Sequence, residues 1–220
     1  MATAVEIQEA PGTRPLVEMH GVGWEGYRVI LDVVGDRGAP RVIYLDGDVI
    51  LMSPTYRHER VAERIGHLVM VITEELEIDC VMSAHTTFRR RKKRGGVEAD
   101  KSFYMANADR VRGKKRIDLR IDPPPDLVVE AVYSHAADDA IEVYRRLGVP
   151  EVWVGDKQAL RILALQSNGS YRAVVASIAF PFLTAVEIFE QLELHLDDAD
   201  NRWLRRVRRW VREILIPRRG

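Results

Sequence analysis

The order of apolar and polar residues in the first half of the chain predicts a hairpin followed by a long helix. Residues 41 to 52, RVIYLDGDVILM, hold two β-prone runs separated by Asp46 and Gly47. Both positions tolerate a positive φ, which makes the dipeptide a hairpin signal. After Ser-Pro-Thr at 53 to 55, a helix start, apolar residues recur at helical spacing to about residue 77: Val61, Ile65, Leu68, Val69, Ile72 and Leu76.

Shorter β-prone runs predict strands in the second half. These runs are residues 80 to 90, a short run within VEADKSFYMAN with Asp100 near its start, and residues 127 to 132, 149 to 154, 159 to 165 and 171 to 175. Residues 135 to 147 have a helical pattern that Gly148 would end. From about residue 184 the chain is predicted to be helical in two pieces.

One predicted strand contains a charged residue that needs a reason. Leu127, Val128, Val129, Ala131 and Val132 form a nearly continuous apolar run, the pattern of a strand covered on both faces. Glu130 interrupts this run. An ionised carboxylate in that setting costs several kcal/mol unless it is paired, hydrogen-bonded or bound to a cation.

Asp100 and Glu130 are two carboxylates on separate β segments that could meet at one divalent cation. Oxygen ligands of this kind suit Mg²⁺ or Mn²⁺. Because Mg²⁺ often takes only one or two protein carboxylates and a phosphate from its substrate, the pair would be enough for phosphodiester chemistry. The alternative is a structural role, with Glu130 paired to an arginine such as Arg120 or Arg145.

Composition narrows the class of protein without choosing a partner. The 33 basic and 33 acidic residues leave no net charge to attract nucleic acid, so such a role would rest on local patches. Two patches exist: RRRKKR from Arg89 to Arg94, and eight arginines with Trp203 and Trp210 between Arg202 and Arg219. The first patch is read as a solvated hairpin tip closed by Gly95 and Gly96, with phosphate contact as the alternative. The second would either lie on DNA or dock its tryptophans on the core.

The single cysteine, Cys80, excludes an internal disulfide and a zinc site built on several thiolates. The N-terminus lacks a basic start followed by an apolar core, and no stretch reaches the roughly 18 apolar residues of a membrane span. We therefore expect a cytoplasmic protein that does not enter a membrane. We expect a lead-in at residues 1–20, one domain at 21–195 and an Arg-rich helical tail at 196–220.

Three segments in order resemble the Uma-type restriction endonuclease family, within the PD-(D/E)XK nuclease superfamily. They are YLDGDVILMSPTYRHERVAERI, then VEADKSFYMAN, then PPPDLVVEAVYS followed by IEVYRRLGVPEVWV. Together they cover roughly residues 40 to 165. The resemblance implies an α/β fold of the PD-(D/E)XK nuclease type, with a mixed central sheet flanked by helices that presents a metal site.

The resemblance also implies roles for individual residues. Asp100 and Glu130 match the two acidic positions that hold Mg²⁺ or Mn²⁺, and the implied activity is hydrolysis of phosphodiester bonds in DNA. His58 matches the histidine after the family's Met-Ser-Pro segment, where it would bind a phosphate or assist with a proton. Asp126 is expected to act in a turn, and Tyr144 is expected to support the fold. A homodimer would suit double-strand cleavage, although no residue pattern indicates one.

The chain departs from the pattern at the catalytic lysine. The superfamily position two residues after the second acid is Val132, and the position that relatives use on the following helix is Ala140. Lys101 neighbours Asp100 but should point to the opposite face of a strand. His135, Arg145 or His58 remain candidate substitutes. The alternative to an enzyme is a degenerate nuclease fold that binds DNA or protein.

Overall fold

The computed structural model describes residues 5–8, 16–35, 39–83, 86–131, 135–155, 158–193 and 197–219. Within these residues the strands form two sheets of six. Sheet A, antiparallel throughout, has the order β1 (Val5–Gln8), β2 (Leu16–Met19), β4 (Asp48–Met52), β3 (Arg41–Leu45), β7 (Gly95–Glu98) and β6 (Thr87–Arg90). The lead-in thus contributes two strands, β1 and β2, that its sequence pattern did not predict. The division into lead-in, domain and tail stays a prediction.

Sheet B is mixed, as predicted for the central sheet. Its order is β12 (Tyr171–Val174), β11 (Leu160–Leu165), β10 (Glu151–Gly155), β9 (Leu127–Glu130), β8 (Lys101–Tyr104) and β5 (Val81–Ser83). β9 and β10 are parallel, and the other neighbours are antiparallel. The predicted strand at residues 80 to 90 is two strands, β5 and β6, which belong to different sheets.

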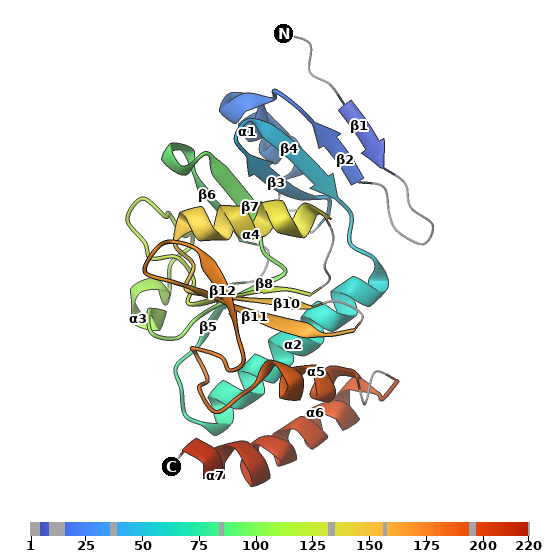
Figure 1. Cartoon of the computed structure of the whole chain (residues 1–220), viewed down its shortest axis with the longest axis vertical. Coiled ribbons are helices and arrows are strands. Elements are labelled where there is room, and N and C mark those ends of the chain that lie inside the picture. The colour runs from blue at the N-terminus through green and yellow to red at the C-terminus, as the bar shows by residue number, and fades with distance from the viewer. Residues whose placement is uncertain are drawn as a thin grey trace.

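Helices separate and cover the two sheets (Figure 1). α4 (His135–Leu147) lies between sheet A and sheet B, α2 (Tyr56–Glu75) crosses the other face of sheet B, and α1 (Gly23–Val34) packs on the outer face of sheet A. α3 (Ala108–Val111) is a single turn in the segment after β8. The α/β class with helices flanking a mixed sheet is confirmed. None of the described helices has both the length and the apolar composition that a bilayer crossing requires.

The predicted buried strand is β9, and it is covered on both faces. Leu127 and Val129 pack in the cluster beneath α2, whereas Val128 packs in the cluster beneath α4. The predicted first hairpin is also confirmed, because Asp46 and Gly47 have positive φ between β3 and β4. Thr55 caps α2, as its position suggested, by accepting a hydrogen bond from the His58 backbone N–H at 3.3 Å.

The basic hairpin differs from its prediction in one detail. Its exposed tip is a 3₁₀ turn, η1 (Arg91–Lys93), which Arg94 closes with a positive φ. Gly95 and Gly96 do not close the tip, because they lie buried in β7. A Cβ at Gly96 would stand 2.2 Å from the Tyr27 hydroxyl, so this glycine is needed for close packing of α1 on sheet A.

The segment from about residue 184 docks as the two predicted helical pieces, α5 (Ala185–Glu193) and α6 (Asp200–Trp210). A π-helical turn, η2 (Val211–Leu215), and α7 (Ile216–Arg219) continue α6. Trp203 is fully buried against α2, and Trp210 packs on the same cluster. The tryptophans therefore dock on the core, one of the two alternatives for this segment.

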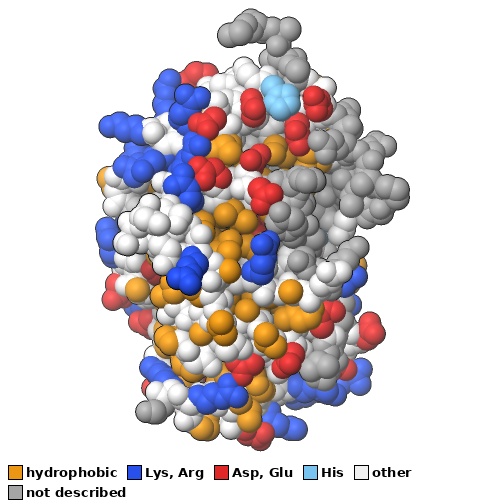
Figure 2. Space-filling view, viewed as in Figure 1, with side chains coloured by type: hydrophobic (Ala, Val, Ile, Leu, Met, Phe, Trp, Pro, Cys, Tyr) orange, Lys and Arg blue, Asp and Glu red, His pale blue; other side chains and the backbone are white. Residues whose placement is uncertain are grey.

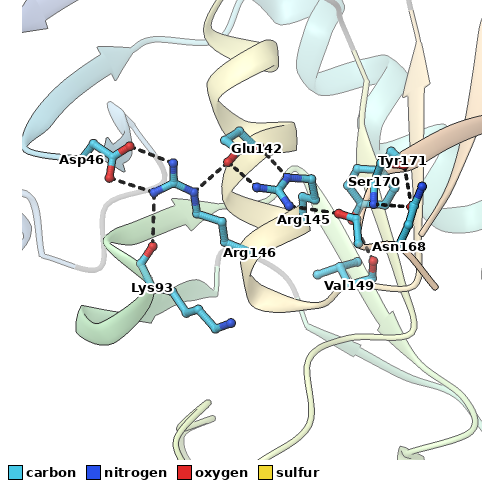
Figure 3. Close-up of polar contacts among 10 residues, drawn as sticks. Asp46, Lys93, Glu142, Arg145, Arg146, Val149, Asn168, Ser170 and Tyr171 are labelled. Carbon is cyan, nitrogen blue, oxygen red and sulfur yellow. Dashed lines mark hydrogen bonds and ion pairs between the residues drawn. The ribbon is translucent and has the colours of Figure 1, made fainter. Parts of the chain in front are cut away.

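A network of charged groups fixes the C-terminal end of α4 (Figure 3). Arg146 makes two hydrogen bonds to Asp46 in the β3–β4 turn, at 2.7 and 2.8 Å, and a third to Glu142 at 2.7 Å. Arg145 pairs with Glu142 as well, and it donates to the Gly169 carbonyl in the β11–β12 turn at 3.0 Å. The network therefore joins turns of both sheets to one helix.

Candidate functional site

A buried arginine on sheet A forms the centre of the candidate site. Arg41 is the first residue of β3 and shares a strand face with Ile43, whose side chain packs in the cluster beneath α4. Its side chain is only 2% exposed. Its guanidinium forms ion pairs with Asp100 and, at 3.0 Å, with Glu59 in the first turn of α2. Arg41 therefore joins sheet A to the start of α2 and to the start of β8.

Asp100 lies at the bend between β7 and β8 and is fully buried. One carboxylate oxygen faces Arg41, and the other, Oδ2, accepts the Ala131 backbone N–H at 2.7 Å and contacts His58 Nε2 at 2.6 Å. The last registered pair of β8 and β9 is Lys101 with Val129. One step further along, Asp100 stands across from Glu130, so the fold brings the two predicted acidic residues to neighbouring positions.

His58 joins Asp100 because the first turn of α2 ends against this bend. Its side chain is buried, and burial, with the nearby Arg41 charge, lowers its pKa to about 4. The imidazole is therefore neutral at pH 7. Since a carboxylate only accepts hydrogen bonds, we assign the Nε2 proton to the contact with Asp100.

Glu130 ends β9 on the face toward α4. It accepts a hydrogen bond from the Tyr144 hydroxyl on α4, and both side chains are buried. Burial raises the pKa of Glu130 to about 7, although Tyr144 and Arg41 both oppose that shift. The Tyr144 hydroxyl thus supports a buried carboxylate in addition to filling the core.

Glu98 adds a further buried carboxylate that the sequence analysis did not single out. It ends β7, two residues before Asp100, and burial raises its pKa to about 7 while Arg41 lowers it. Arg41 thus acts on four carboxylates: it is ion-paired with Glu59 and Asp100 and lies near enough to Glu98 and Glu130 to lower their pKa values. The Arg41 guanidinium is thus paired with two carboxylates and lies near two more, whose pKa values burial raises.

Other residues considered for the site lie elsewhere. Ala140 is on the buried face of α4, in the core between this helix and the sheets. Lys101 pairs with Glu63 at 2.6 Å. Arg145 pairs with Glu142, and Arg120 pairs with Asp118, so neither arginine is the partner of Glu130. Val132 and the His135 side chain lie outside the described residues. Asp126 has the predicted turn role, because it accepts N–H groups from Met105 and Asn107.

Arg41 is the functional candidate that the sequence analysis missed. A signal for it was present, because β-strand alternation places Arg41 on the same face as Ile43 and Leu45, which both pack inward. The charge at the edge of a hairpin strand resembled an ordinary exposed arginine. Only the packing of β3 against the α2 start and the β7–β8 bend shows that its guanidinium is enclosed.

The donor set fits a divalent cation in chemistry. Asp100 and Glu130 offer oxygen ligands of the type that Mg²⁺ and Mn²⁺ take, and the surplus of buried carboxylates over cations favours added positive charge. In the part of the chain that the structure describes, however, Asp100 and Glu130 do not belong to a group of three metal-type side chains whose ligand atoms lie within 4.8 Å of one another. Among the described residues, the group of three metal-type side chains with ligand atoms within 4.8 Å is instead Glu6, Glu18 and His20, at the surface of sheet A.

The fold is an α/β fold of the nuclease-like class. The structure is similar to the crystal structure of a putative nuclease belonging to DUF820 from Anabaena variabilis ATCC 29413, with a TM-score of 0.51 and 14% sequence identity. The match covers 75% of this chain and 92% of that chain. At this identity the likeness concerns the fold alone.

The chain belongs to the Uma2 family, described as "Putative restriction endonuclease", whose sequence model matches residues 24–197. The resemblance noted in the sequence is thereby confirmed, together with a nuclease-like class of function. No curated protein matches the chain.

Proposed function

We propose that the protein is a metal-dependent endonuclease that hydrolyses phosphodiester bonds in DNA, with Asp100 and Glu130 as ligands of one Mg²⁺ or Mn²⁺ ion. The observation that carries the proposal is that the buried carboxylates of Asp100 and Glu130 stand at neighbouring strand positions, with the buried Arg41 guanidinium paired to Asp100. A structural ion pair needs one acid for each base. A site that must accept a divalent cation and a phosphate needs the surplus of acid found here.

Each residue has a distinct part in the proposed reaction. The bound ion would polarise a phosphoryl oxygen and lower the pKa of the attacking water. Asp100 and Glu130 would hold the ion, and Glu130 would be oriented by the Tyr144 hydroxyl. His58 would hold Asp100 in position through Nε2. Asp100 would exchange its ion pair with Arg41 for contact with the ion.

Arg41 is the proposed substitute for the missing lysine. In the superfamily pattern, a cationic side chain stabilises the charge that develops on the phosphoryl group. Ala140 offers no charge, and Lys101 is paired with Glu63. Arg41 is a permanent cation beside Asp100, and its planar guanidinium can bind two phosphate oxygens at once.

The test is metal-dependent nicking of supercoiled plasmid by purified wild-type protein, Glu130→Gln, Asp100→Asn and Arg41→Lys. Wild type should nick with Mg²⁺ or Mn²⁺ and not with a chelator. Both acid variants should lose at least about 100-fold in rate, the scale on which transition-state charge stabilisation is lost. Glu142→Gln, a carboxylate change on α4 outside the site, should keep wild-type activity.

Isothermal titration with Mn²⁺ separates binding from cleavage. Wild type should take up the ion, and Glu130→Gln should not. Absence of Mn²⁺ binding at millimolar concentration, or nicking that persists in both acid variants, would refute the assignment.

A second candidate function is a degenerate nuclease fold that binds DNA or protein without cutting. One observation favours it: the Arg41 guanidinium already neutralises Asp100, as a metal ion would. This reading expects Arg41→Lys and Glu130→Gln to leave plasmid intact and partner binding unchanged. Metal-dependent nicking by wild type would exclude it.

A further inference from the structure

A groove of about 1,090 Å³ is formed by three segments that are distant in sequence. Its walls come from α1, from the β5 to η1 region, and from residues 111 to 120 after α3. We call it the basic groove. Lys and Arg side chains gather at the upper left of Figure 2, over α1 and the β6–β7 hairpin that supply part of its wall.

Cationic side chains dominate the lining of the basic groove. Seven lysines and arginines face two aspartates, Asp32 and Asp118. Four of the cations are held by carboxylates: Arg28 and Arg91 pair with Glu25, Lys114 with Asp122, and Arg120 with Asp118. The remaining three, Arg89, Lys115 and Arg116, form no ion pair with a carboxylate anywhere in the described ranges. Their charges are available to an anionic partner.

The groove lining also contains apolar side chains that nucleic-acid bases would contact. Trp24, Leu31, Met82, Ile117 and Leu119 lie among the cations. Trp24 is held edge-on against Tyr44, with ring centroids 5.4 Å apart, so its indole is a fixed wall. A cationic groove with apolar and aromatic surface suits a single strand, whose phosphates meet the charges and whose bases meet the apolar wall. A duplex keeps its bases stacked inside and would leave that wall uncovered.

The sheet register places the basic groove next to the carboxylates. Thr87 in the groove lies directly across the strand pair from Glu98, and Ser83 lies across from Ser102, two residues after Asp100. The groove strands β5 and β6 are thus the hydrogen-bonded neighbours of β8 and β7, which lead into the site. A strand held in the groove would lie one β-strand away from Asp100 and Glu98.

We propose that the basic groove binds a single-stranded nucleic-acid segment and leads it toward the Asp100–Glu130 site. The inference deepens the proposed nuclease function and rests on it for the direction of the strand. Arg89 from the hairpin, and Lys115 and Arg116 from the loop, would bind backbone phosphates. Trp24 would stack on a base.

The experiment measures fluorescence anisotropy of a labelled oligothymidine of about 15 nucleotides, within the usual site size of such grooves, in excess chelator. The chelator separates binding from cleavage. Lys115→Ala with Arg116→Ala should weaken binding at least about tenfold near physiological salt and lower the salt slope by about 1.4, at about 0.7 for each phosphate contact on single strands. Trp24→Ala should weaken binding without changing the salt slope.

The matched control removes the same charge elsewhere. Arg205→Ala with Arg209→Ala changes two arginines on the outer surface of α6, and binding should stay within about twofold of wild type. Unchanged binding in the groove variants, equal loss in the α6 control, or tighter binding of a duplex of the same length would each overturn the inference. Equal thermal midpoints would show that the loop variants fold, as expected for two side chains that make no ion pair with the described part of the chain.

A separate variant tests the nuclease proposal. Glu130→Gln should bind the oligonucleotide as wild type does while failing to cut plasmid. If wild type never cuts but the groove variants lose binding, the groove stands and the nuclease proposal fails. If wild type cuts and the groove variants bind normally, the groove inference fails alone.

Discussion

Two charged regions lie against α4, and they are built in opposite ways. At the C-terminal end of α4, Arg145 and Arg146 face Glu142 and Asp46 in a half-exposed network (Figure 3). Arg94 also pairs with Asp46, so each acid in this network has at least two basic partners. At the candidate site, buried Arg41 pairs with buried Asp100 and half-buried Glu59, and two further buried acids, Glu98 and Glu130, lie nearby. The first arrangement joins elements of the fold. The second holds more acidic groups than ion pairing within the fold requires.

The pKa values of the two regions differ in the same way. Hydrogen bonds and charge from Arg145 and Arg146 lower the pKa of Glu142 to about 2, which is the mark of a satisfied carboxylate. Burial raises the pKa of both Glu98 and Glu130 to about 7 despite the nearby arginine. A carboxylate pKa that is raised toward 7, in a cluster whose negative charges are only partly balanced by cations, is more typical of functional sites than of structural ion pairs.

The largest expected effect is that of Arg41→Met, which removes the buried positive charge paired with Asp100 and Glu59. It should lower the free energy of unfolding by about 3–5 kcal/mol, because Asp100 would stay buried without its ion pair. Urea unfolding at pH 7 measures the change. If Arg41→Met costs no more than the same substitution at Arg146, the contrast between the two regions is wrong.

A smaller effect is expected at the C-terminal end of α4. Arg146→Met should cost about 1 kcal/mol, since its ion pairs with Asp46 and Glu142 are partly open to solvent. The same urea titration measures it. Arg172→Met on β12, an exposed arginine without an ion pair among the described residues, should stay within about 0.5 kcal/mol of wild type. Equal losses at Arg146 and Arg172 would show that the network does not stabilise the fold.

The smallest effect depends on pH. The folded pKa of Glu142 is lowered to about 2 from an ordinary 4.5, so its contribution is present above pH 4.5 and is lost as the pH falls toward 2. Glu142→Gln should therefore destabilise the protein at pH 7 by less than about 1 kcal/mol, because solvent screens the pairs. The difference between variant and wild type should shrink below pH 4.5.

Thermal unfolding across this pH range provides the measurement, with Glu190→Gln on α5 as the control. Glu190 is exposed, so its substitution should leave the pH profile unchanged. A deficit of Glu142→Gln that stays constant down to the acid limit would mean that the ion pairs are not its cause.

Local signals determined most of the elements. The Asp46–Gly47 turn, the apolar stripe of α2 and the continuous apolar run of β9 each follow from backbone preference or side-chain periodicity. These signals act within a few residues, so they can be recognised without knowing the neighbours. The acidic pair was recognised for a related reason, because Glu130 contradicts the pattern of its own strand.

Partners that are distant in the chain could not be found in this way. The predicted strand at residues 80 to 90 divides between two sheets, because β5 pairs with β8 while β6 pairs with β7. Gly95 and Gly96 look like turn residues, yet they lie in a strand where Tyr27 leaves no room for a Cβ at Gly96 and Val143 crowds Gly95. Pairing and steric exclusion by another element are absent from local sequence.

The sequence by itself determined the family, the nuclease-like α/β fold and two acidic residues worth testing. Tertiary structure alone decided what surrounds them: His58 and Arg41 on Asp100, and Tyr144 on Glu130. The chain lacks a lysine at Ala140, and Arg41 reaches the acids from another sheet, 59 residues before Asp100 in the numbering. An arginine becomes a site residue when packing encloses its charge, and that enclosure depends on elements which only the folded chain brings together.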